Sequence, residues 1–126
     1  FDVDGCIYLQ TGNKYGKFDL SVGGHVQRGE SYTQAAQREM EEEIGLSVPI
    51  IHVSTFLPKE ARMNHFWGIF TATAPLGWVF TETEEVKTLE KIRLEKIKQM
   101  MRENPESFTY GFMNTKQELL TKIEII

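Results

Sequence analysis

Residues 24–46 read GHVQRGESYTQAAQREMEEEIGL. Glutamates occupy positions 39, 41, 42 and 43, although the whole chain of 126 residues has a net charge of only −4. Neighbouring carboxylates on a helix repel one another, so this density is unfavourable unless the side chains face water or a cation lies among them. These two explanations predict different functions, and the surrounding residues favour one of them.

The stretch carries the start and stop signals of one helix. Ser31 and Gln34 have the spacing of a capping box at the N-terminus. Gly45 is the residue type that most often ends a helix, and Pro49 follows shortly after it. The sequence therefore predicts a helix over residues 31–44.

The glutamates of this predicted helix fall next to its buried face. At about 100° per residue, Glu39, Glu42 and Glu43 point to one side, whereas Glu41 points to solvent. The adjacent face is apolar and carries Ala36, Met40 and Ile44. Carboxylates beside a buried face are costly unless they are compensated, and Mg²⁺ or Mn²⁺ with oxygen ligands is a natural compensation. Judged on the helix alone, a charged surface in water remains the alternative.

The wider spacing decides between these explanations. Gly24 is followed after five residues by Glu30, and after seven more by an Arg-Glu pair, an aliphatic residue, any residue, a Glu-Glu pair, any residue, glycine and an aliphatic residue. Seven fixed positions would coincide by chance with a probability on the order of 10⁻⁸ per window. Over these 23 residues the chain resembles the signature of the Nudix hydrolases.

The resemblance implies a fold, a cofactor and a set of site residues. It implies an α+β fold, an α/β/α sandwich with a mixed, partly antiparallel sheet flanked by helices. It implies divalent cations, Mg²⁺ or Mn²⁺, held by the box helix, and attack of activated water on a diphosphate linkage. The implied metal ligands are Glu39, Glu42, Glu43 and a backbone carbonyl at Gly23 or Gly24. Arg38 would orient Glu39, and Glu30 would support the cluster.

Within the Nudix hydrolases, the stretch FDLSVGGHVQRGESYTQAA and the later VFTETEEV and NPESFTYGF resemble the branch most similar to isopentenyl diphosphate isomerase. The isomerases carry a catalytic cysteine just before the glycine-histidine pair, where this chain has Gly23. They also have a degraded box, whereas this box is intact. Hydrolysis is therefore the favoured function, with isomerisation or a non-catalytic nucleotide-sensing module as alternatives.

Further site candidates lie outside the helix. His25 matches a metal-binding histidine of the isomerases, although a polar loop residue is the simpler interpretation. A loop carboxylate is expected to assist deprotonation of water; the candidates are Glu82, Glu84 and Glu85, of which we select Glu85. Arg62, in the polar connection between two predicted strands, is a candidate contact for substrate phosphates. Phe66 or Trp67 could stack on a base, but core packing is the simpler role.

The rest of the chain predicts a single Nudix domain over residues 1–126. The predicted strands cover residues 5–10, 18–24, 48–58, 65–74 and 86–92, and two further helices cover 93–104 and 110–125. Because residue 1 begins as though already inside a strand-turn-strand, we expect a strand of the native protein to precede it. The substrate identity cannot be predicted, because loops outside the box determine it.

Composition restricts the partners and the location. The mild acidity, 14 basic against 18 acidic residues, argues against a general nucleic-acid binder. No apolar run approaches the roughly 18 residues of a membrane span. A single cysteine, Cys6, which we expect to be buried and inert, fits a reducing compartment, so we expect a cytoplasmic protein with a small diphosphate as its partner. A homodimer is compatible with the sequence but is not predicted by it.

Overall fold

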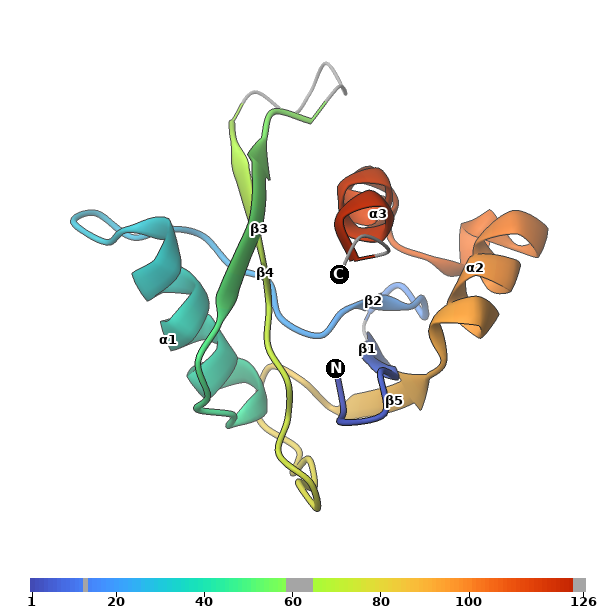
Figure 1. Ribbon diagram of the computed structural model, residues 1–126, viewed down its shortest axis with the longest axis horizontal. Helices are drawn as coiled ribbons and strands as arrows, with labels where there is room; N and C mark the ends of the chain where they lie inside the picture. The colour runs from blue at the N-terminus through green and yellow to red at the C-terminus, as the bar shows by residue number, and fades with distance from the viewer. Residues whose placement is uncertain (13, 59–64, 124–126) are drawn as a thin grey trace.

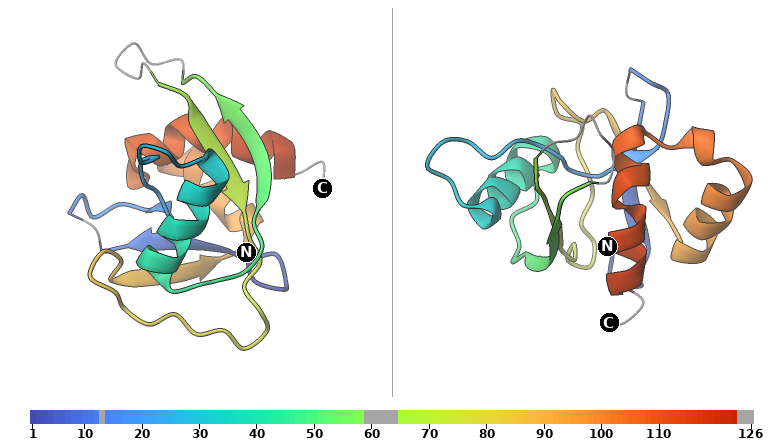
Figure 2. Two further views of the ribbon diagram at one scale, coloured as in Figure 1. Left: turned by 90° about the vertical axis from the view of Figure 1, so that its left-hand side faces the viewer. Right: turned by 90° about the horizontal axis from the view of Figure 1, so that it is seen from above.

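The architecture was analysed in a computed structural model, which describes residues 1–12, 14–58 and 65–123. Its elements in chain order are β1 (Ile7–Thr11), β2 (Asp19–Leu20), α1 (Tyr32–Ile44), β3 (Ile51–Phe56), β4 (Trp67–Thr71), β5 (Thr88–Ile92), α2 (Leu94–Glu103), a 3₁₀ turn (Pro105–Ser107) and α3 (Tyr110–Ile123). Figures 1 and 2 show α1 on one side of the β3–β4 pair and α3 on the other. This layering agrees with the predicted α/β/α sandwich.

The strands of the described residues form two small sheets. One has the order β2-β1-β5 and the other consists of β3 and β4, and the pairs within both are antiparallel. In the described part of the chain, the parallel contact of the predicted mixed sheet is an isolated bridge between Phe18 and Phe108. The predicted strand over residues 48–58 begins only at Ile51, because Pro49 just before it has no N–H to donate to a ladder.

Helix α1 begins and ends where the sequence predicts. The Ser31 hydroxyl accepts from the backbone N–H of Gln34 at 3.1 Å, and the Gln34 side chain accepts from the N–H of Ser31 at 2.9 Å. At the other end Gly45 adopts φ 67° and donates to the carbonyl of Glu41 at 3.1 Å. The capping box and the glycine stop are therefore confirmed, and they fix which residues of the box share a face.

Within the part of the chain that the structure describes, two apolar clusters hold the elements together. The first joins β1 and β5 to the helices α2 and α3; it contains Ile7, Leu9, Ile92, Ile97, Met101, Phe108 and Phe112. The second packs the C-terminal half of α1 against the segment that leads into β5; it contains Met40, Ile44, Leu46, Ala74 and Val86. This second cluster places the end of the glutamate helix beside the loop that carries Glu82, Glu84 and Glu85.

Two predicted core positions differ in the structure. Ala35 is buried and Ala36 only half-buried, so the apolar face of α1 is turned slightly from the expected one. Cys6 is half-buried instead of buried, because it precedes β1 in a turn that Asp2 organises through its bond with the Cys6 N–H. Within the described residues, no helix combines the length and the hydropathy needed to span a membrane.

Candidate active site

Arg38 is the centre of an ion-pair network on α1. Its guanidinium binds Glu30 through two bonds, from Nε at 2.7 Å and from Nη2 at 2.9 Å. Nη1 lies 2.7 Å from Glu39 Oε1 and 3.3 Å from Glu42 Oε2, and Nη2 also donates to the carbonyl of His25 at 3.2 Å. The planar fork of arginine suits such a shared role, since lysine has no rigid pair of donors. Arg38 thereby ties the loop before the helix to the acidic face.

The network shifts the pKa values of its members. The hydrogen bonds from Arg38 are the largest cause that lowers the pKa of Glu30 to about 2, and the backbone N–H of Gln27 contributes in the same direction. The pKa of Arg38 is raised by Glu30 first and by Glu39 second. Both groups are therefore charged around neutral pH, and their ion pair holds the loop to the helix.

Glu43 lies in a different environment from the other glutamates of the box. Its side chain is buried, with 7% of the residue exposed, and its Oε2 accepts from the N–H of Gly23 at 2.9 Å. Burial raises the pKa of Glu43 to about 7; the Gly23 bond partly opposes this, and the charges of Glu39 and Glu85 add to it. A carboxylate in this position is ready to exchange its proton for a cation.

Three carboxylates from two segments converge at this point. One oxygen each of Glu39, Glu43 and Glu85 lies within 4.8 Å of the other two. Glu39 and Glu43 come from α1, whereas Glu85 comes from the loop before β5. Hard oxygen donors gathered around one point are the donor set that Mg²⁺ and Mn²⁺ prefer, so the residues present fit such an ion.

The loop that carries Glu85 is fastened to the end of α1. The Thr83 hydroxyl donates to the backbone carbonyl of Glu43 at 2.7 Å and accepts from the N–H of Val86 at 3.1 Å. The backbone N–H of Thr83 also donates to the carbonyl of Val86 at 3.0 Å, and Val86 is only 1% exposed. Sequence reasoning missed Thr83, because nothing in TETEE distinguishes it from Thr81.

The backbone of Gly24 lies so close to the Glu39 side chain that a Cβ at this position would clash with it. A Cβ on Gly24 would lie 2.5 Å from Glu39 Oε1 and 2.7 Å from Glu39 Cγ, and closer still to Cδ. Its φ is not positive, so the requirement for glycine here is steric and not conformational. The glycine that opens the box therefore makes room for the carboxylate of Glu39.

The other predicted site residues lie around this cluster. Glu42 is exposed and contacts Arg38, outside the set of three carboxylates described above. Gly23 meets Glu43 through its N–H, and His25 contacts Arg38 through its carbonyl, with an exposed side chain. Arg62 lies outside the described residues.

Of the remaining candidates, Glu82 pairs with Lys87 at 3.3 Å on the surface, and Glu84 is exposed. Phe66 is 58% exposed, while Trp67 is half-buried and packs its ring against Phe56 with the centroids 6.2 Å apart. The structure thus brings Glu85, and neither Glu82 nor Glu84, into the group with Glu39 and Glu43.

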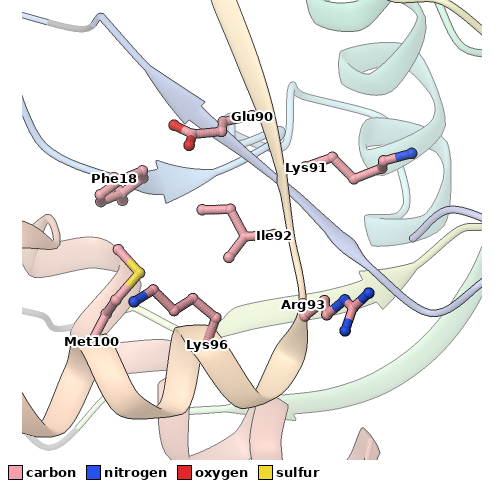
Figure 3. Close-up of a pocket in the computed structure, with 7 residues that line it drawn as sticks. All are labelled: Phe18, Glu90, Lys91, Ile92, Arg93, Lys96 and Met100. Atoms are coloured by element: carbon pink, nitrogen blue, oxygen red, sulfur yellow. The ribbon is translucent and has the colours of Figure 1, made fainter.

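A cavity of about 520 Å³ lies elsewhere, between β5 and α2. Figure 3 shows Lys96 and Met100 extending toward Phe18, while Lys91 and Arg93 point the other way. Lys91 instead pairs with Asp2 at 3.3 Å. The basic side chains of this cavity do not converge, and none of its lining residues belongs to the predicted site.

The raised pKa of Glu43 predicts a specific pH dependence of stability for the metal-free protein. Because the folded-state pKa of about 7 exceeds the ordinary value of 4.5, the folded state holds the proton more tightly, and this group reduces stability as pH rises from 4.5 to 7. Between pH 5 and pH 8 we expect Glu43 to lower the free energy of unfolding by roughly 2–3 kcal/mol. Glu43→Gln, which keeps an acceptor for Gly23, should lack this loss.

Urea unfolding in EDTA at the two pH values measures the effect. Glu41→Gln, on the solvent side of the same helix, serves as the matched control and should keep the pH dependence of the wild type. Equal pH dependence in wild type and Glu43→Gln would show that Glu43 is ionised without strain in the folded protein.

Comparisons with known proteins agree with this geometry. The sequence model of the NUDIX domain matches residues 2–112. An uncharacterized Nudix hydrolase of Listeria innocua is 32% identical over 104 residues, covering 81% of this chain and 60% of that protein. An isopentenyl-diphosphate Delta-isomerase of Serratia proteamaculans is 30% identical over 133 residues, covering 94% of this chain and 72% of the isomerase. The chain thus spans about 60% of the length of the Listeria relative.

The fold is similar to that of solved Nudix structures. The NUDIX domain of NrtR from Shewanella oneidensis, complexed with ADP ribose, superposes with a TM-score of 0.64 at 16% sequence identity, over 94% of this chain and 77% of that one. A similarity at this level of identity supports the fold and confirms the predicted α+β class. With the match of the family over residues 2–112 and the intact box of residues 24–46, the chain belongs to the Nudix hydrolase family.

Proposed function

We propose that this protein is a Mg²⁺-dependent pyrophosphohydrolase that cleaves a diphosphate linkage in a nucleoside diphosphate derivative or a related small diphosphate. The observation that carries the proposal is the convergence of Glu39, Glu43 and Glu85 within 4.8 Å, beside an intact box. This arrangement does not stabilise the metal-free protein, because the charges of Glu39 and Glu85 raise the pKa of the buried Glu43.

The residues of the proposed site have separate roles. Glu39 and Glu43 on α1 would hold the cation, and the exposed Glu42, which lies 3.3 Å from Arg38, would be a further ligand. When bound, the ion lowers the pKa of water and neutralises charge on the phosphate oxygens. Arg38 fixes the carboxylate of Glu39 at 2.7 Å and is itself fixed by Glu30. Arg38 is thus a positioning residue.

Glu85 is the proposed general base. It is exposed, so it can reach water, and its carboxylate stands within 4.8 Å of the ligand oxygens. Glu85 takes a proton from the attacking water, whose oxygen bonds to one phosphorus while the bond from that phosphorus to the bridging oxygen breaks. The two halves of the diphosphate leave as two phosphate-bearing products.

The Serratia relative makes isomerisation of an isoprenoid diphosphate the second candidate function. The similarity extends over 94% of this chain, so the coverage gives no reason to reject isomerisation. Two features speak for hydrolysis. Gly23 has no side chain at the position where the isomerases are expected to carry cysteine, and Cys6 lies before β1, outside the loop of residues 21–24.

The cellular location and the partners are proposed from the cysteine content and the net charge. We propose a cytoplasmic protein that acts on a free small molecule, because a single half-buried cysteine suits a reducing compartment. The net charge of −4 argues against a general nucleic-acid binder. The substrate's negative charge is instead balanced at the proposed cation site.

The test is a panel assay in water labelled with ¹⁸O. ADP-ribose, nucleoside triphosphates, nucleotide sugars, dinucleoside polyphosphates and isopentenyl diphosphate are each incubated with the protein, in Mg²⁺ and in EDTA. We expect at least one substrate to be hydrolysed in Mg²⁺ and none in EDTA, with the label in one phosphate product. Conversion of isopentenyl diphosphate to its allylic isomer without phosphate release would replace the proposal by the isomerase function. Calorimetric binding of a nucleotide without turnover would replace it by the sensing function.

A further inference from the structure

The segment between Glu82 and Val86 is held to the end of α1 by one side-chain hydrogen bond, from Thr83. In Figures 1 and 2 the chain that leads into β5 runs past the C-terminal end of α1, where the Thr83 hydroxyl bonds to the carbonyl of Glu43 at 2.7 Å. We propose that Thr83 is a positioning residue that holds Glu85 beside the ligands Glu39 and Glu43 and thereby sets the affinity of the site for divalent cations. This inference rests on the proposed function and assigns a residue that the family signature of residues 24–46 does not contain.

The first argument is electrostatic. Without a cation, the three carboxylates repel one another, and Glu85 is the exposed member on a loop, so it is the one free to move away. One oxygen each of Glu85 and Glu39 lies within 4.8 Å of an oxygen of the buried Glu43, so the three carboxylates face one another at close range. A loop carboxylate stays in such a place only when its backbone is fastened.

The second argument is the arrangement of the fastening. Val86, 1% exposed, anchors the loop one residue after Glu85, and Thr83 anchors it two residues before. The Thr83 hydroxyl is both a donor and an acceptor: it donates to the backbone carbonyl of Glu43 and accepts from the N–H of Val86 at 3.1 Å. The backbone bond from Thr83 to Val86 at 3.0 Å closes the turn around Glu85.

The third argument is which helix residue Thr83 contacts. The carbonyl of Glu43 belongs to the last turn of α1, where backbone carbonyls lack partners within the helix. Thr83 satisfies this carbonyl, so a proposed ligand of the helix and the loop that presents Glu85 move as one unit. Partners that orient ligands in this way typically contribute 10–100-fold to metal affinity.

The experiment measures cation affinity directly. Binding of Mn²⁺ is titrated by electron paramagnetic resonance in the absence of substrate, for wild type, Thr83→Val, Thr83→Ser and Glu85→Gln. Valine keeps the shape but loses both bonds, whereas serine keeps them. We expect about 10-fold weaker binding for Thr83→Val and for Glu85→Gln, and binding within about twofold of wild type for Thr83→Ser. Thr81→Val, an exposed position on the same loop, is the matched control and should bind as wild type does.

A double variant shows through which residue Thr83 acts. If Thr83 acts by placing Glu85, the double variant Thr83→Val/Glu85→Gln binds Mn²⁺ no weaker than Glu85→Gln alone, within about twofold. Additive losses would overturn the inference, since Thr83 would then act through Glu43 or the helix end. Unchanged affinity in a folded Thr83→Val, with Glu39→Gln impaired, would also overturn it and leave the proposed function standing. Absence of Mn²⁺ binding by wild type would remove the proposed function and this inference together.

Thermal unfolding shows whether a loss of Mn²⁺ affinity comes from a displaced Glu85 or from a destabilised protein. Thr83→Val and Thr83→Ser are compared at the same pH in EDTA, and Mn²⁺ titrations are made well below both midpoints. A loss of affinity in Thr83→Val under these conditions is a property of the folded site. Recovery in Thr83→Ser shows that the hydroxyl, and not the methyl group, is responsible.

Discussion

Replacing Glu39 by glutamine is expected to lower kcat/KM about 10³-fold, which corresponds to about 4 kcal/mol of lost transition-state stabilisation. Glu39 occupies the centre of the proposed site: Arg38 holds one side of its carboxylate at 2.7 Å, and one of its oxygens belongs to the cluster with Glu43 and Glu85. Glutamine has the same shape, so the packing against Gly24 is kept. Its amide, however, has no negative charge with which to bind a cation.

The loss should appear in two measurements. Mn²⁺ affinity falls in the absence of substrate, and kcat falls at saturating Mg²⁺ because the remaining carboxylates hold the ion in another position. Glu41→Gln is the matched control on the same helix: Glu41 is exposed, accepts a bond from Ser47 at 2.9 Å, and points away from the cluster. It should retain wild-type activity. Activity of Glu39→Gln within about threefold of wild type would exclude Glu39 as a ligand.

The box helix illustrates what sequence can predict. Its limits, the capping box at Ser31 and Gln34 and the stop at Gly45 all depend on local chemistry within a few residues, and the structure confirms them. The pairing of Arg38 with Glu42 is also local, because helix periodicity places residues four apart on one face, and Glu39 is the next residue in the sequence. Sequence-local interactions of this kind need no knowledge of the tertiary fold.

The loop side of the site illustrates what sequence cannot predict. Glu82, Glu84 and Glu85 are chemically equivalent in TETEE, and the choice among them depends on how the chain crosses the end of α1. That crossing is fixed by the burial of Val86 and by the bond between Thr83 and Glu43, which are 40 residues apart. Long-range contacts of this kind carry no local signal, so Thr83 could be found only in the structure.

Gly24 illustrates a third case, in which the structure adds a second role to a residue that the sequence identifies, while the carbonyl ligand stays a prediction. Close approach of the backbone to a ligand predicts a carbonyl donor at Gly23 or Gly24. In the structure, Gly23 uses its N–H to bind Glu43, and Gly24 leaves space for the side chain of Glu39. The same residue type therefore serves steric accommodation, which motif spacing alone does not distinguish from cation binding.

This accommodation predicts a large effect for Gly24→Ala. The added Cβ would lie 2.5 Å from Glu39 Oε1 and 2.7 Å from Cγ, distances that real Cβ contacts do not show. The Glu39 carboxylate cannot easily turn aside, because Arg38 holds it at 2.7 Å, so the carboxylate or the loop must move by roughly 1 Å. Metal–ligand distances lie within about 0.2 Å of their usual values, and a 1 Å misplacement costs on the order of 100-fold in rate.

We therefore expect kcat/KM of Gly24→Ala to fall about 100-fold, with Mn²⁺ affinity reduced in parallel. Gly111→Ala in α3 is the matched control, since a Cβ there meets no atom within 4 Å and alanine favours the helix. It should retain activity and unfold at the same or a higher temperature. If Gly24→Ala is folded and binds Mn²⁺ as wild type does, the carboxylate of Glu39 has room to move without loss. Glu39 would then not be held in the position on which the proposed cation site depends.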